Sequence, residues 1–386
     1  MMKRAISLIL SAVLLLGLSA CGDRKTAQSE PVVTGTLVDD SVYVYQPGAE
    51  DPAAPQGNGT LIAFAADSSG VESGPNAGAW RGVETFAENY GFTAQNFVAE
   101  DASYEATLAA LRQAAESGAP LVVCRGETMG VALYEVQNNY PTVSYLLLES
   151  EPHSVDYVGY STAANVHCIL FQEEQAGYLA GYATVMEGFT SVGFLGGEQL
   201  PGNVRYCTGF LQGVNQAAEV QGTDVYVRIW FCNRSEPGEE ITEKVMNWFA
   251  NGAGMVFTCG ELVQSAVDAS GGSNCIISAG WDASEMGDAV LSSAVLNRSA
   301  IVQKALYSFF SNGHEAWAAE NAGVTRQVGY SDDAVALSTS GWKFRRFSQT
   351  DYQKVYEQLR SSTLKVERYS DTSSLPELPN VVLDIQ

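Results

Sequence analysis

Leu61–Ala66 (LIAFAA) is an uninterrupted apolar run, and it begins the pattern that decides the fold. After a Gly/Ser loop, large apolar side chains recur at the spacing of one helix face within Ala77–Tyr90, and Gly91 follows. A short apolar run suits a strand that is buried on both faces, while the helical spacing predicts an amphipathic helix that the glycine ends. A buried strand followed by such a helix is the repeating unit of a parallel α/β sheet.

The same alternation continues outward from this unit in two series. In the first series we expect strands at Thr93–Ala99, Pro120–Cys124 and Val143–Glu149, with helices at Tyr104–Ser117 and Met129–Asn138. The second begins with a long helix at Glu173–Glu187, followed by strands at Ser191–Gly196, Val225–Phe231, Gly254–Cys259 and Asn274–Gly280 and helices at Tyr206–Glu219, Glu239–Asn251 and Leu262–Ser270. A returning strand at Val290–Val295 and a helix at Ser299–Ser311 come last. Two series of similar size in 386 residues predict two α/β lobes.

The first 21 residues predict export. Lys3 and Arg4 precede an apolar run that ends near Leu18, which is the composition of a signal peptide and too short for a good membrane-spanning helix. Leu18-Ser19-Ala20-Cys21 resembles the lipobox of bacterial lipoproteins. This resemblance implies cleavage before Cys21 and acylation of its thiol, including palmitate, on the extracytoplasmic face of the cell membrane. The alternative is an ordinary signal peptide with a coincidental cysteine.

The net charge of −23 excludes some classes of partner. A field this negative disfavours nucleic acid and anionic lipid head groups, so acyl chains are the expected membrane attachment. Gly22–Asn58 is polar and reads as a tether with one short strand at Ser41–Tyr45.

The cysteines and histidines do not predict a metal site. Six cysteines follow Cys21, none of them in a CxxC pair, and there are three histidines, of which His153 is expected at the surface. Free buried thiols are favoured over disulfides, which an exported protein also permits. We expect no cofactor and no metal.

Four blocks of sequence carry a family likeness. Gln172–Gly181 (QEEQAGYLAG), Val192–Gly197 (VGFLGG), Gly209–Gly213 (GFLQG) and Gly280–Asp282 (GWD) resemble the basic membrane protein family, substrate-binding lipoproteins of ABC importers that include purine-nucleoside receptors. The likeness extends over about 61–347. Within it, Gly177 and Gly181 share one helix face, where small residues permit close approach to a neighbour.

The resemblance implies a type I periplasmic-binding-protein fold, with two Rossmann-like lobes, a hinge and a ligand cleft between the lobes. The expected parts are the signal peptide 1–20, a tether 21–57, a first lobe of 58–168 with 295–322, a second lobe of 169–294 with 323–370, and a C-terminal strap 371–386. The implied function is capture of a small polar ligand, such as a nucleoside, by a monomer that delivers it to an ABC permease and ATPase.

Ligands of open α/β sheets bind beyond the carboxyl ends of the strands. This rule selects Asp67, Ser68, Arg125, Gly126, Glu127, Glu149, Gly260, Glu261, Trp281 and Asp282. The resemblance adds Asn76 before the first helix, and Trp80 is a further aromatic candidate. Asp282 is the strongest candidate, because its position resembles the family aspartate that accepts hydrogen bonds from ribose hydroxyls; the alternative is a cap on the following helix.

Each of the other candidates also has a structural interpretation. Asp67 is a loop cap or a ligand contact, Asn76 is also a helix N-cap, and Glu149 is also a solvated strand end. Trp80 lies on the apolar side of its helix and is also a core residue. Arg125, Glu127 and Glu261 are weaker candidates.

Two positions depart from the nucleoside receptors. Pro75 stands where those receptors place a phenylalanine that stacks on the base, and Asn297 stands where a lysine is common. Trp281 or Trp80 would then have to supply the aromatic face, and the identity of the ligand stays open.

No catalytic residues are expected. Gly159–Ala163 (GYSTA) nearly copies a nucleophile elbow but lacks its final glycine. The alternatives to an importer receptor are a sensor that signals to a membrane receptor and, less favoured, an extracytoplasmic enzyme.

Overall fold

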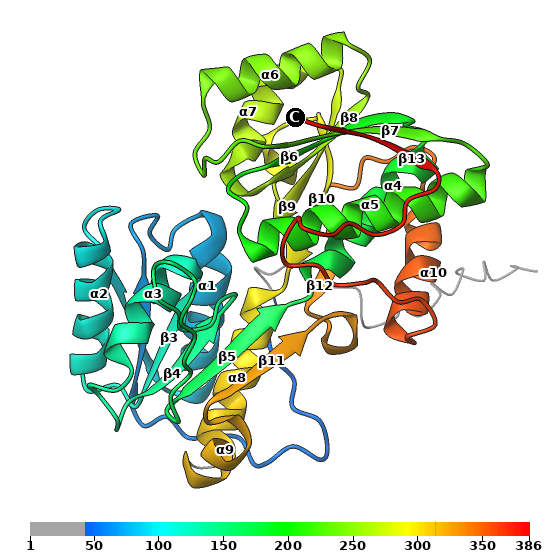
Figure 1. Ribbon diagram of the computed structural model, residues 1–386. Helices are drawn as coiled ribbons and strands as arrows, with labels where there is room; N and C mark the ends of the chain where they lie inside the picture. Colours follow the sequence, from blue (N-terminus) through cyan, green and yellow to red (C-terminus); the bar gives the residue numbers. More distant parts are fainter. Residues whose placement is uncertain (1–42, 313) are drawn as a thin grey trace, which may run out of the picture. The chain divides into compact units, whose positions relative to one another are not determined.

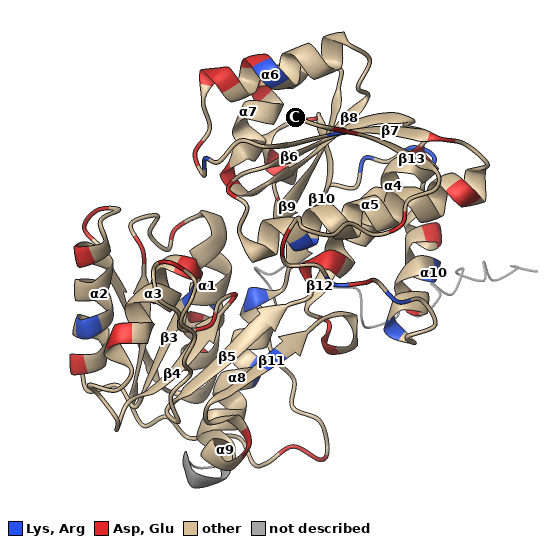
Figure 2. Ribbon diagram, in the orientation of Figure 1, with Lys and Arg blue, Asp and Glu red and all other residues tan. Residues whose placement is uncertain are grey.

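The computed structural model describes residues 43–312 and 314–386. The signal peptide, Cys21 and the first part of the expected tether lie outside the described residues. Within the described part of the chain, no helix has the length and apolar content needed to cross a membrane. Acidic residues are spread over the helices and loops of this part (Figure 2).

The first sheet has six parallel strands in the order β11-β5-β4-β3-β1-β2 (Figure 1). Its strands are β1 (Leu61–Ala66), β2 (Thr93–Val98), β3 (Leu121–Arg125), β4 (Ser144–Leu148), β5 (Val166–Phe171) and β11 (Val324–Val328). The associated helices are α1 (Gly74–Tyr90), α2 (Tyr104–Glu116), α3 (Glu127–Val136), α8 (Arg298–Asn312) and α9 (His314–Asn321).

Strand β1 explains why this sheet is covered on both faces. Ile62 and Phe64 belong to the same apolar cluster as Trp80 and Val83 of α1, whereas Ala63 belongs to the cluster that contains the buried residues of α2 and α3. Successive side chains of a strand point to opposite faces, so an unbroken apolar run needs helices on both sides.

The second sheet has the order β12-β10-β9-β8-β6-β7-β13, and β12 alone runs antiparallel to its neighbour. Its strands are β6 (Ser191–Gly196), β7 (Val225–Phe231), β8 (Met255–Cys259), β9 (Cys275–Gly280), β10 (Val290–Leu296), β12 (Val335–Leu337) and β13 (Val381–Ile385). The associated helices are α4 (Glu173–Glu187), α5 (Pro201–Gln221), α6 (Glu239–Ala250), α7 (Val263–Ser270) and α10 (Gln349–Arg360).

Helices α4 and α5 lie side by side along the second sheet (Figure 1). A Cβ atom added to Gly177 or Gly181 would overlap the carbonyl of Tyr206 or Phe210 on α5. In return, a Cβ atom on Gly209 would overlap the carbonyl of Glu174 on α4. The predicted close approach at the two glycines of α4 is confirmed, and it requires small residues on both helices.

The predicted α/β fold with parallel sheets is confirmed. Both sheets contain the doubly wound order 2-1-3-4-5, in β2-β1-β3-β4-β5 and in β7-β6-β8-β9-β10. The chain passes from one sheet to the other after β5, after β10 and after β11. Strands β5 and β11 extend the first sheet past the boundaries expected at residues 168 and 322.

The strand expected at Ser41–Tyr45 is wrong where the structure describes it, because Tyr43–Tyr45 pairs with no strand. Instead, the Tyr45 amide donates to Gln303 Oε1 of α8 at 2.9 Å, and Gln303 Nε2 donates to the Tyr43 carbonyl at 2.8 Å. The Tyr307 hydroxyl of the same helix donates to the Pro52 carbonyl at 2.6 Å. Hydrogen bonds therefore hold the segment before β1 against α8.

The cysteines after Cys21 are free thiols in this structure. Four of them are buried, namely Cys124, Cys168, Cys207 and Cys259. Cys232 and Cys275 are half-buried. The surface position expected for His153 is wrong, because its side chain is 0% exposed. Its two ring nitrogens lie 3.0 Å from Glu127 Oε2 and 2.8 Å from the Ser154 carbonyl.

Candidate ligand-binding site

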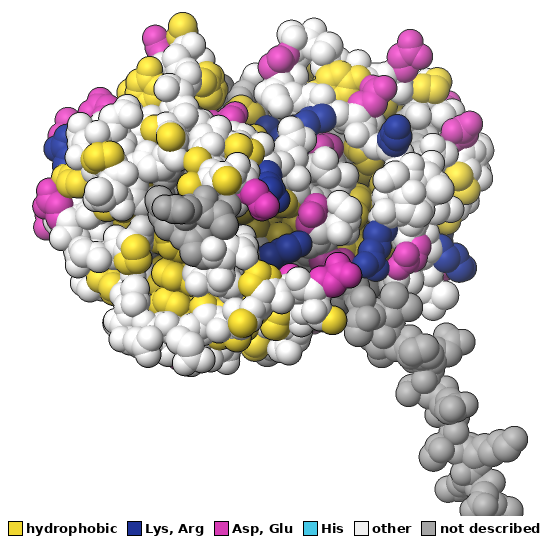
Figure 3. Space-filling model, turned by 90° about the horizontal axis from the view of Figure 1, so that it is seen from below, with side chains coloured by type: hydrophobic (Ala, Val, Ile, Leu, Met, Phe, Trp, Pro, Cys, Tyr) yellow, Lys and Arg dark blue, Asp and Glu magenta, His cyan; other side chains and the backbone are white. Residues whose placement is uncertain are grey.

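A cavity of about 700 Å³ lies against segments that belong to both sheets. Its lining residues are Glu72, Ser73, Gly74, Ala77, Gly78, Arg81, Gly280, Trp281, Asp282, Ser284, Glu285, Val295, Leu296, Asn297, Arg298, Ser340 and Gly341. Cavities of roughly 300–1,000 Å³ are typical of small-molecule sites. A space-filling view shows basic and acidic side chains gathered around a hollow on the face that it displays (Figure 3).

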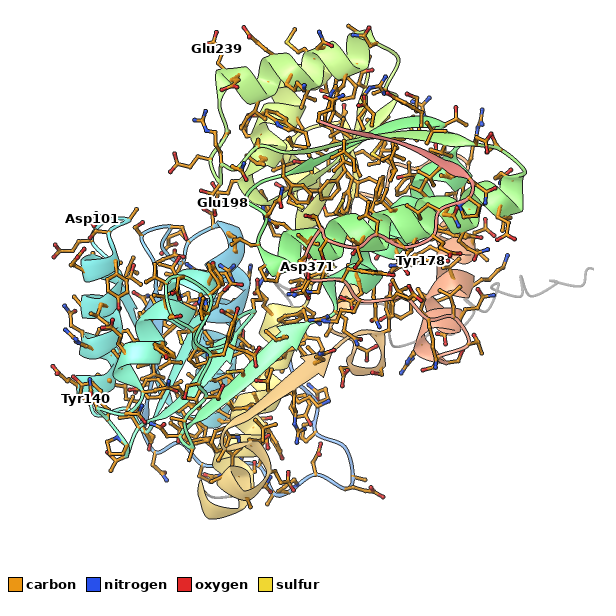
Figure 4. All side chains as sticks on the ribbon, viewed as in Figure 1. Asp101, Tyr140, Tyr178, Glu198, Glu239 and Asp371 are labelled. Atoms are coloured by element: carbon orange, nitrogen blue, oxygen red, sulfur yellow. The ribbon has the colours of Figure 1, made fainter. Side chains whose placement is uncertain are left out.

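The cavity lies where parallel strands end. Its lining segments follow β1, β9 and β10, so they leave the carboxyl ends of these strands. Figure 4 marks the two ends of the first sheet, with Asp101 just after β2 at one end and Tyr140 just before β4 at the other. This is the position that the strand-end rule predicts for a ligand.

Asp282 lines the cavity, but neighbouring donors already bind its carboxylate. Oδ2 accepts hydrogen bonds from the hydroxyls of Ser338 at 2.6 Å and Ser340 at 2.5 Å, and Oδ1 accepts one from the Ser284 amide at 2.9 Å. Burial by itself would raise the pKa of Asp282, but these hydrogen bonds outweigh it and lower the pKa. The carboxylate is therefore held ionised and in a fixed orientation.

Trp281 and Arg81 line the cavity, and one nitrogen of each side chain is buried. Trp281 follows β9, and Arg81 lies on α1 one turn after Ala77 and Gly78. The indole Nε1 of Trp281 and the Nε of Arg81 are both buried, and neither has a hydrogen-bond acceptor among the described residues. Trp281 was predicted as a site residue, whereas Arg81 was missed.

Behind the cavity, one carboxylate is bound by two guanidinium groups. Glu149 accepts hydrogen bonds from Arg125 at 3.0 and 3.2 Å and from Arg298 at 2.5 and 3.0 Å. Burial would raise the pKa of Glu149, but the two arginines outweigh it and lower the pKa to about 2. Arg298 also donates to the Gly280 carbonyl, so this cluster joins β3 and β4 of the first sheet to the end of β9 in the second.

Comparison with known proteins decides the family. Residues 60–371 match the Bmp family model, which is described as ABC transporter substrate-binding protein PnrA-like. The chain belongs to the Bmp family. Its members are substrate-binding proteins of ABC transporters, so the protein acts outside the cytoplasm with a small-molecule ligand and an ABC transporter as partners.

Solved structures agree on the fold. An ABC transporter solute-binding protein from Aeropyrum pernix K1 has a TM-score of 0.61 and 17% identity, covering 81% of this chain and 94% of that one. An ABC transporter solute-binding protein from Conexibacter woesei DSM 14684 has a TM-score of 0.60 and 18% identity, and the match covers 81% of this chain and 100% of that one. A transcriptional activator of the comK gene from Bacillus halodurans has a TM-score of 0.59 and 15% identity, covering 83% and 100%. The type I periplasmic-binding-protein fold is thus confirmed. A comparison with curated proteins finds no match.

In this Bmp-family protein, the loop after β1 is held by its own side chains. Asp67 Oδ1 accepts hydrogen bonds from Ser69 and from Asn76 Nδ2, and Asn76 Oδ1 accepts one from Arg125 Nη1 at 3.1 Å. Asn76 is buried, and Ser68 is exposed. None of Asp67, Ser68, Asn76 and Arg125 lines the cavity. Asp67, Asn76 and Arg125 support the loop that leads to it.

The other predicted residues also lie off the cavity lining. Trp80 is buried and packs against Phe64, with ring centroids 5.8 Å apart. Gly126 has φ +87° at the start of α3, and Glu127 accepts a hydrogen bond from Ser150 at 2.9 Å as well as facing His153. Gly260 has φ +57°, where glycine is favoured.

Glu261 is exposed and approaches α1, because a Cβ atom on Gly74 would lie 3.1 Å from its Oε1.

The two positions that depart from the nucleoside receptors have structural roles. Pro75 occupies the first turn of α1, and Asn297 lines the cavity while its Oδ1 accepts from the Ala300 amide at 3.3 Å in the first turn of α8.

Arg298, like Arg81, is a basic lining residue that is absent from the site predicted from the sequence. It comes directly after Asn297, at the carboxyl end of β10, so the strand-end rule would have selected it. For Arg81 the available signal was helical spacing, since Gly74, Ala77, Gly78 and Arg81 fall on one face of α1.

Proposed function

We propose that this Bmp-family protein captures a nucleoside or a related small polar molecule in the cavity between its two sheets and delivers it to an ABC importer. The observation that carries this proposal is the cavity itself, which has the volume of a small-molecule site and draws its lining from segments of both sheets. Such a ligand stabilises the arrangement in which both sets of residues contact it. Acylation of Cys21 would keep the protein near its transporter.

Within the cavity, we propose Trp281 and Asp282 as ligand contacts. The indole offers a flat apolar face for a base, and the ionised carboxylate accepts hydrogen bonds from sugar hydroxyls. Ser340 also lines the cavity and binds Asp282 Oδ2, so a ligand hydroxyl can replace the serine hydroxyl at that oxygen.

A thermal-shift screen of the purified protein against nucleosides, bases, sugars and amino acids tests the proposal. A ligand at about 100 times its Kd stabilises the folded state by about 2.7 kcal/mol, which raises the unfolding midpoint measurably. We expect at least one nucleoside to produce this shift. A screen in which every nucleoside leaves the midpoint unchanged would remove nucleosides as ligands.

The Asp282→Ala variant tests the contact. We expect it to abolish the nucleoside shift, because the sugar hydroxyls lose their charged acceptor. Ser340→Ala is the matched control: it removes one internal donor, leaves the carboxylate in place and should keep the shift. Loss of the shift in both variants, or in neither, would argue against a direct contact by Asp282.

A further inference from the structure

Four large apolar side chains are exposed within one short loop. Val155, Tyr157, Val158 and Tyr160 are 73%, 40%, 82% and 53% exposed, and they lie between β4 and β5. No other stretch of six residues in the described part of the chain contains more than two exposed large apolar side chains. Apolar side chains that are exposed singly are normal, whereas a group of them marks an interaction site. We call Ser154–Tyr160 the apolar loop.

The apolar loop is folded by its own hydrogen bonds. The Ser154 amide donates to the Gly159 carbonyl at 2.8 Å, and the Tyr157 amide donates to the Ser154 carbonyl at 2.9 Å. The buried ring of His153 stacks on Tyr157 with ring centroids 4.4 Å apart, and its Nε2 lies 3.0 Å from Glu127 Oε2 at the start of α3. The exposed side chains are therefore held on a preformed turn, so binding a partner requires little further loss of loop entropy.

The apolar loop lies at the edge of the first sheet that also holds the ligand cavity. It follows the carboxyl end of β4, and Glu149, the first residue after that strand, binds Arg298 of the cavity lining. No residue of the apolar loop itself lines the cavity. A partner bound to the loop would thus lie at the same edge of the sheet as the ligand without competing with it for side chains.

Carboxylates lie around the apolar loop. Asp156 is exposed within it, and Glu151 precedes it. The carboxylates of Glu127 and Glu198 also act on the Tyr157 ring, although partial burial is the main reason that the pKa of Tyr157 is raised to about 12. Glu198 follows β6 of the second sheet. The surface that fits an apolar loop with a negative border is an apolar depression bordered by lysine or arginine.

The charges argue against two other occupants of the loop. A membrane surface that contains anionic lipids would repel the carboxylates. A second copy of the chain would place the same carboxylates opposite one another, because a twofold interface joins identical patches. An ABC transporter is the protein partner that family membership gives this chain. Its ATPase lies in the cytoplasm, so the permease is the subunit that a protein outside the cytoplasm can contact.

We propose that the apolar loop docks onto the extracytoplasmic surface of the ABC permease, in an apolar depression bordered by lysine or arginine side chains. This inference rests on the importer function proposed above but not on the identity of the ligand. It adds a docking element that can be altered separately from the ligand cavity, because the two share no residue.

Photo-cross-linking tests the docking directly. A purified Val158→Cys variant carrying a thiol-reactive photo-cross-linker is illuminated with membranes from the cells that make this protein, and mass spectrometry identifies the cross-linked chain. We expect a membrane-spanning permease that co-purifies with a Walker-motif ATPase, and a yield that falls several-fold when salt is raised from about 0.05 to about 0.5 M. Cross-links to lipid, to a second copy of this chain or to no partner would overturn the inference, as would a yield that salt leaves unchanged.

Val220→Cys, at an exposed valine of α5, is the matched control. It should give no cross-link to the permease. The unaltered protein treated with the same reagent reports any labelling of the half-buried Cys232 and Cys275. Permease cross-links of equal yield from positions 158 and 220 would contradict a specific docking loop.

Val158→Asp separates docking from ligand capture. The added carboxylate removes an apolar contact, so transport of a bound nucleoside into right-side-out vesicles that contain the permease and ATPase should fall at least about tenfold. The affinity for the nucleoside in isothermal titration should change less than about threefold, since Val158 does not line the cavity. Val220→Asp should leave both quantities unchanged.

The outcomes distinguish docking from capture. Undiminished transport by Val158→Asp would overturn the docking role and leave nucleoside capture standing. Failure of every nucleoside to bind would remove nucleosides as ligands, and the cross-linking result would then decide the docking role alone. If Val158→Asp also loses nucleoside binding, Val158→Ser removes the apolar group without adding charge, and transport should still fall several-fold at unchanged affinity.

Discussion

Glu149 illustrates how much depends on one side chain. Its carboxylate lies between two guanidinium groups, from residues 24 positions before it and 149 positions after it. Its backbone has φ +67°, a left-handed conformation that is uncommon for a residue with a side chain. In this conformation its carboxylate binds both arginines, and it supports Arg298 at the cavity.

We predict that Glu149→Gln lowers the free energy of unfolding by about 3 kcal/mol at neutral pH, because two buried guanidinium groups lose their shared counter-charge. The pKa of Glu149 is lowered from 4.5 to about 2, so its contribution is present above about pH 4.5 and is lost as the pH falls toward 2. Urea denaturation at several pH values should show the difference between the proteins shrinking over this range.

Glu116→Gln is the control for this substitution, since the Glu116 carboxylate accepts a hydrogen bond from Tyr140 at an exposed position. It should change the free energy of unfolding by less than about 0.5 kcal/mol. A difference between Glu149→Gln and the unaltered protein that stays constant from neutral pH to pH 2 would contradict the role assigned to the carboxylate.

The residues of the site were predictable to different degrees. Trp281 and Asp282 line the cavity as their place after a strand suggests, because the strand-end rule depends only on topology. The same rule also selected Glu149, which lies at a strand end but is bound by Arg298. Which of several strand ends a cavity uses depends on side chains from distant segments, so the rule selects more residues than the cavity uses.

At the scale of elements, the reciprocal glycine contacts of α4 and α5 decide how closely these helices approach. The sequence indicated this for Gly177 and Gly181, because residues four apart share a helix face. The partner glycines, Gly209 and Gly213, are also four apart, and Cβ atoms on them would overlap the carbonyls of Glu174 and Tyr178.

We predict that Gly209→Ala destabilises the protein by about 1–3 kcal/mol, because the methyl group meets backbone atoms of α4 that cannot move independently. Gly202→Ala in the same helix is the control: the nearest atom to its Cβ would be 3.6 Å away, and the higher helix propensity of alanine should leave stability unchanged or raise it by up to about 1 kcal/mol. Chemical denaturation of both variants measures the contrast, and similar losses in the two would contradict the packing argument.

The sequence did not predict strands β5 and β11, and the structure shows why. Strand β11 lies at the edge of the first sheet, with Arg326 and Gln327 in its sequence, so it lacks the continuous apolar run of a central strand. In β5 the apolar run is interrupted by His167, whose ring nitrogen lies 2.9 Å from the Val324 carbonyl. Both strands were recognisable only through their pairing partners.

At the scale of the whole molecule, the end of the chain completes a sheet. Val381–Ile385 forms β13 and pairs in parallel with Val225–Ile229 of β7, and Trp248 Nε1 donates to Gln386 Oε1 at 3.2 Å. The family match ends at residue 371, before this strand. Without β13, β7 would present an unpaired edge.

We predict that deleting residues 380–386 lowers the midpoint of thermal unfolding and promotes aggregation, because the edge of β7 becomes available to other chains. Each kcal/mol lost should lower the midpoint by roughly 2–4 °C or less in a protein of this size. Scanning calorimetry and light scattering measure the two effects. The Val382→Ser control keeps the backbone pairing and changes a half-exposed side chain, so a loss as large as that of the deletion would assign the effect to the side chain.

The sequence by itself determined the α/β class, the family motifs, most central strands and helices, and two residues of the cavity lining. These properties follow from local periodicity and from strand direction, which are encoded within a few neighbouring residues. The tertiary structure alone decided that Arg125 and Arg298 share Glu149, that β13 closes an edge, and that Arg81 of α1 and Trp281 after β9 line one cavity. Each of these depends on which distant side chains and strands come into contact, and packing in three dimensions sets those contacts.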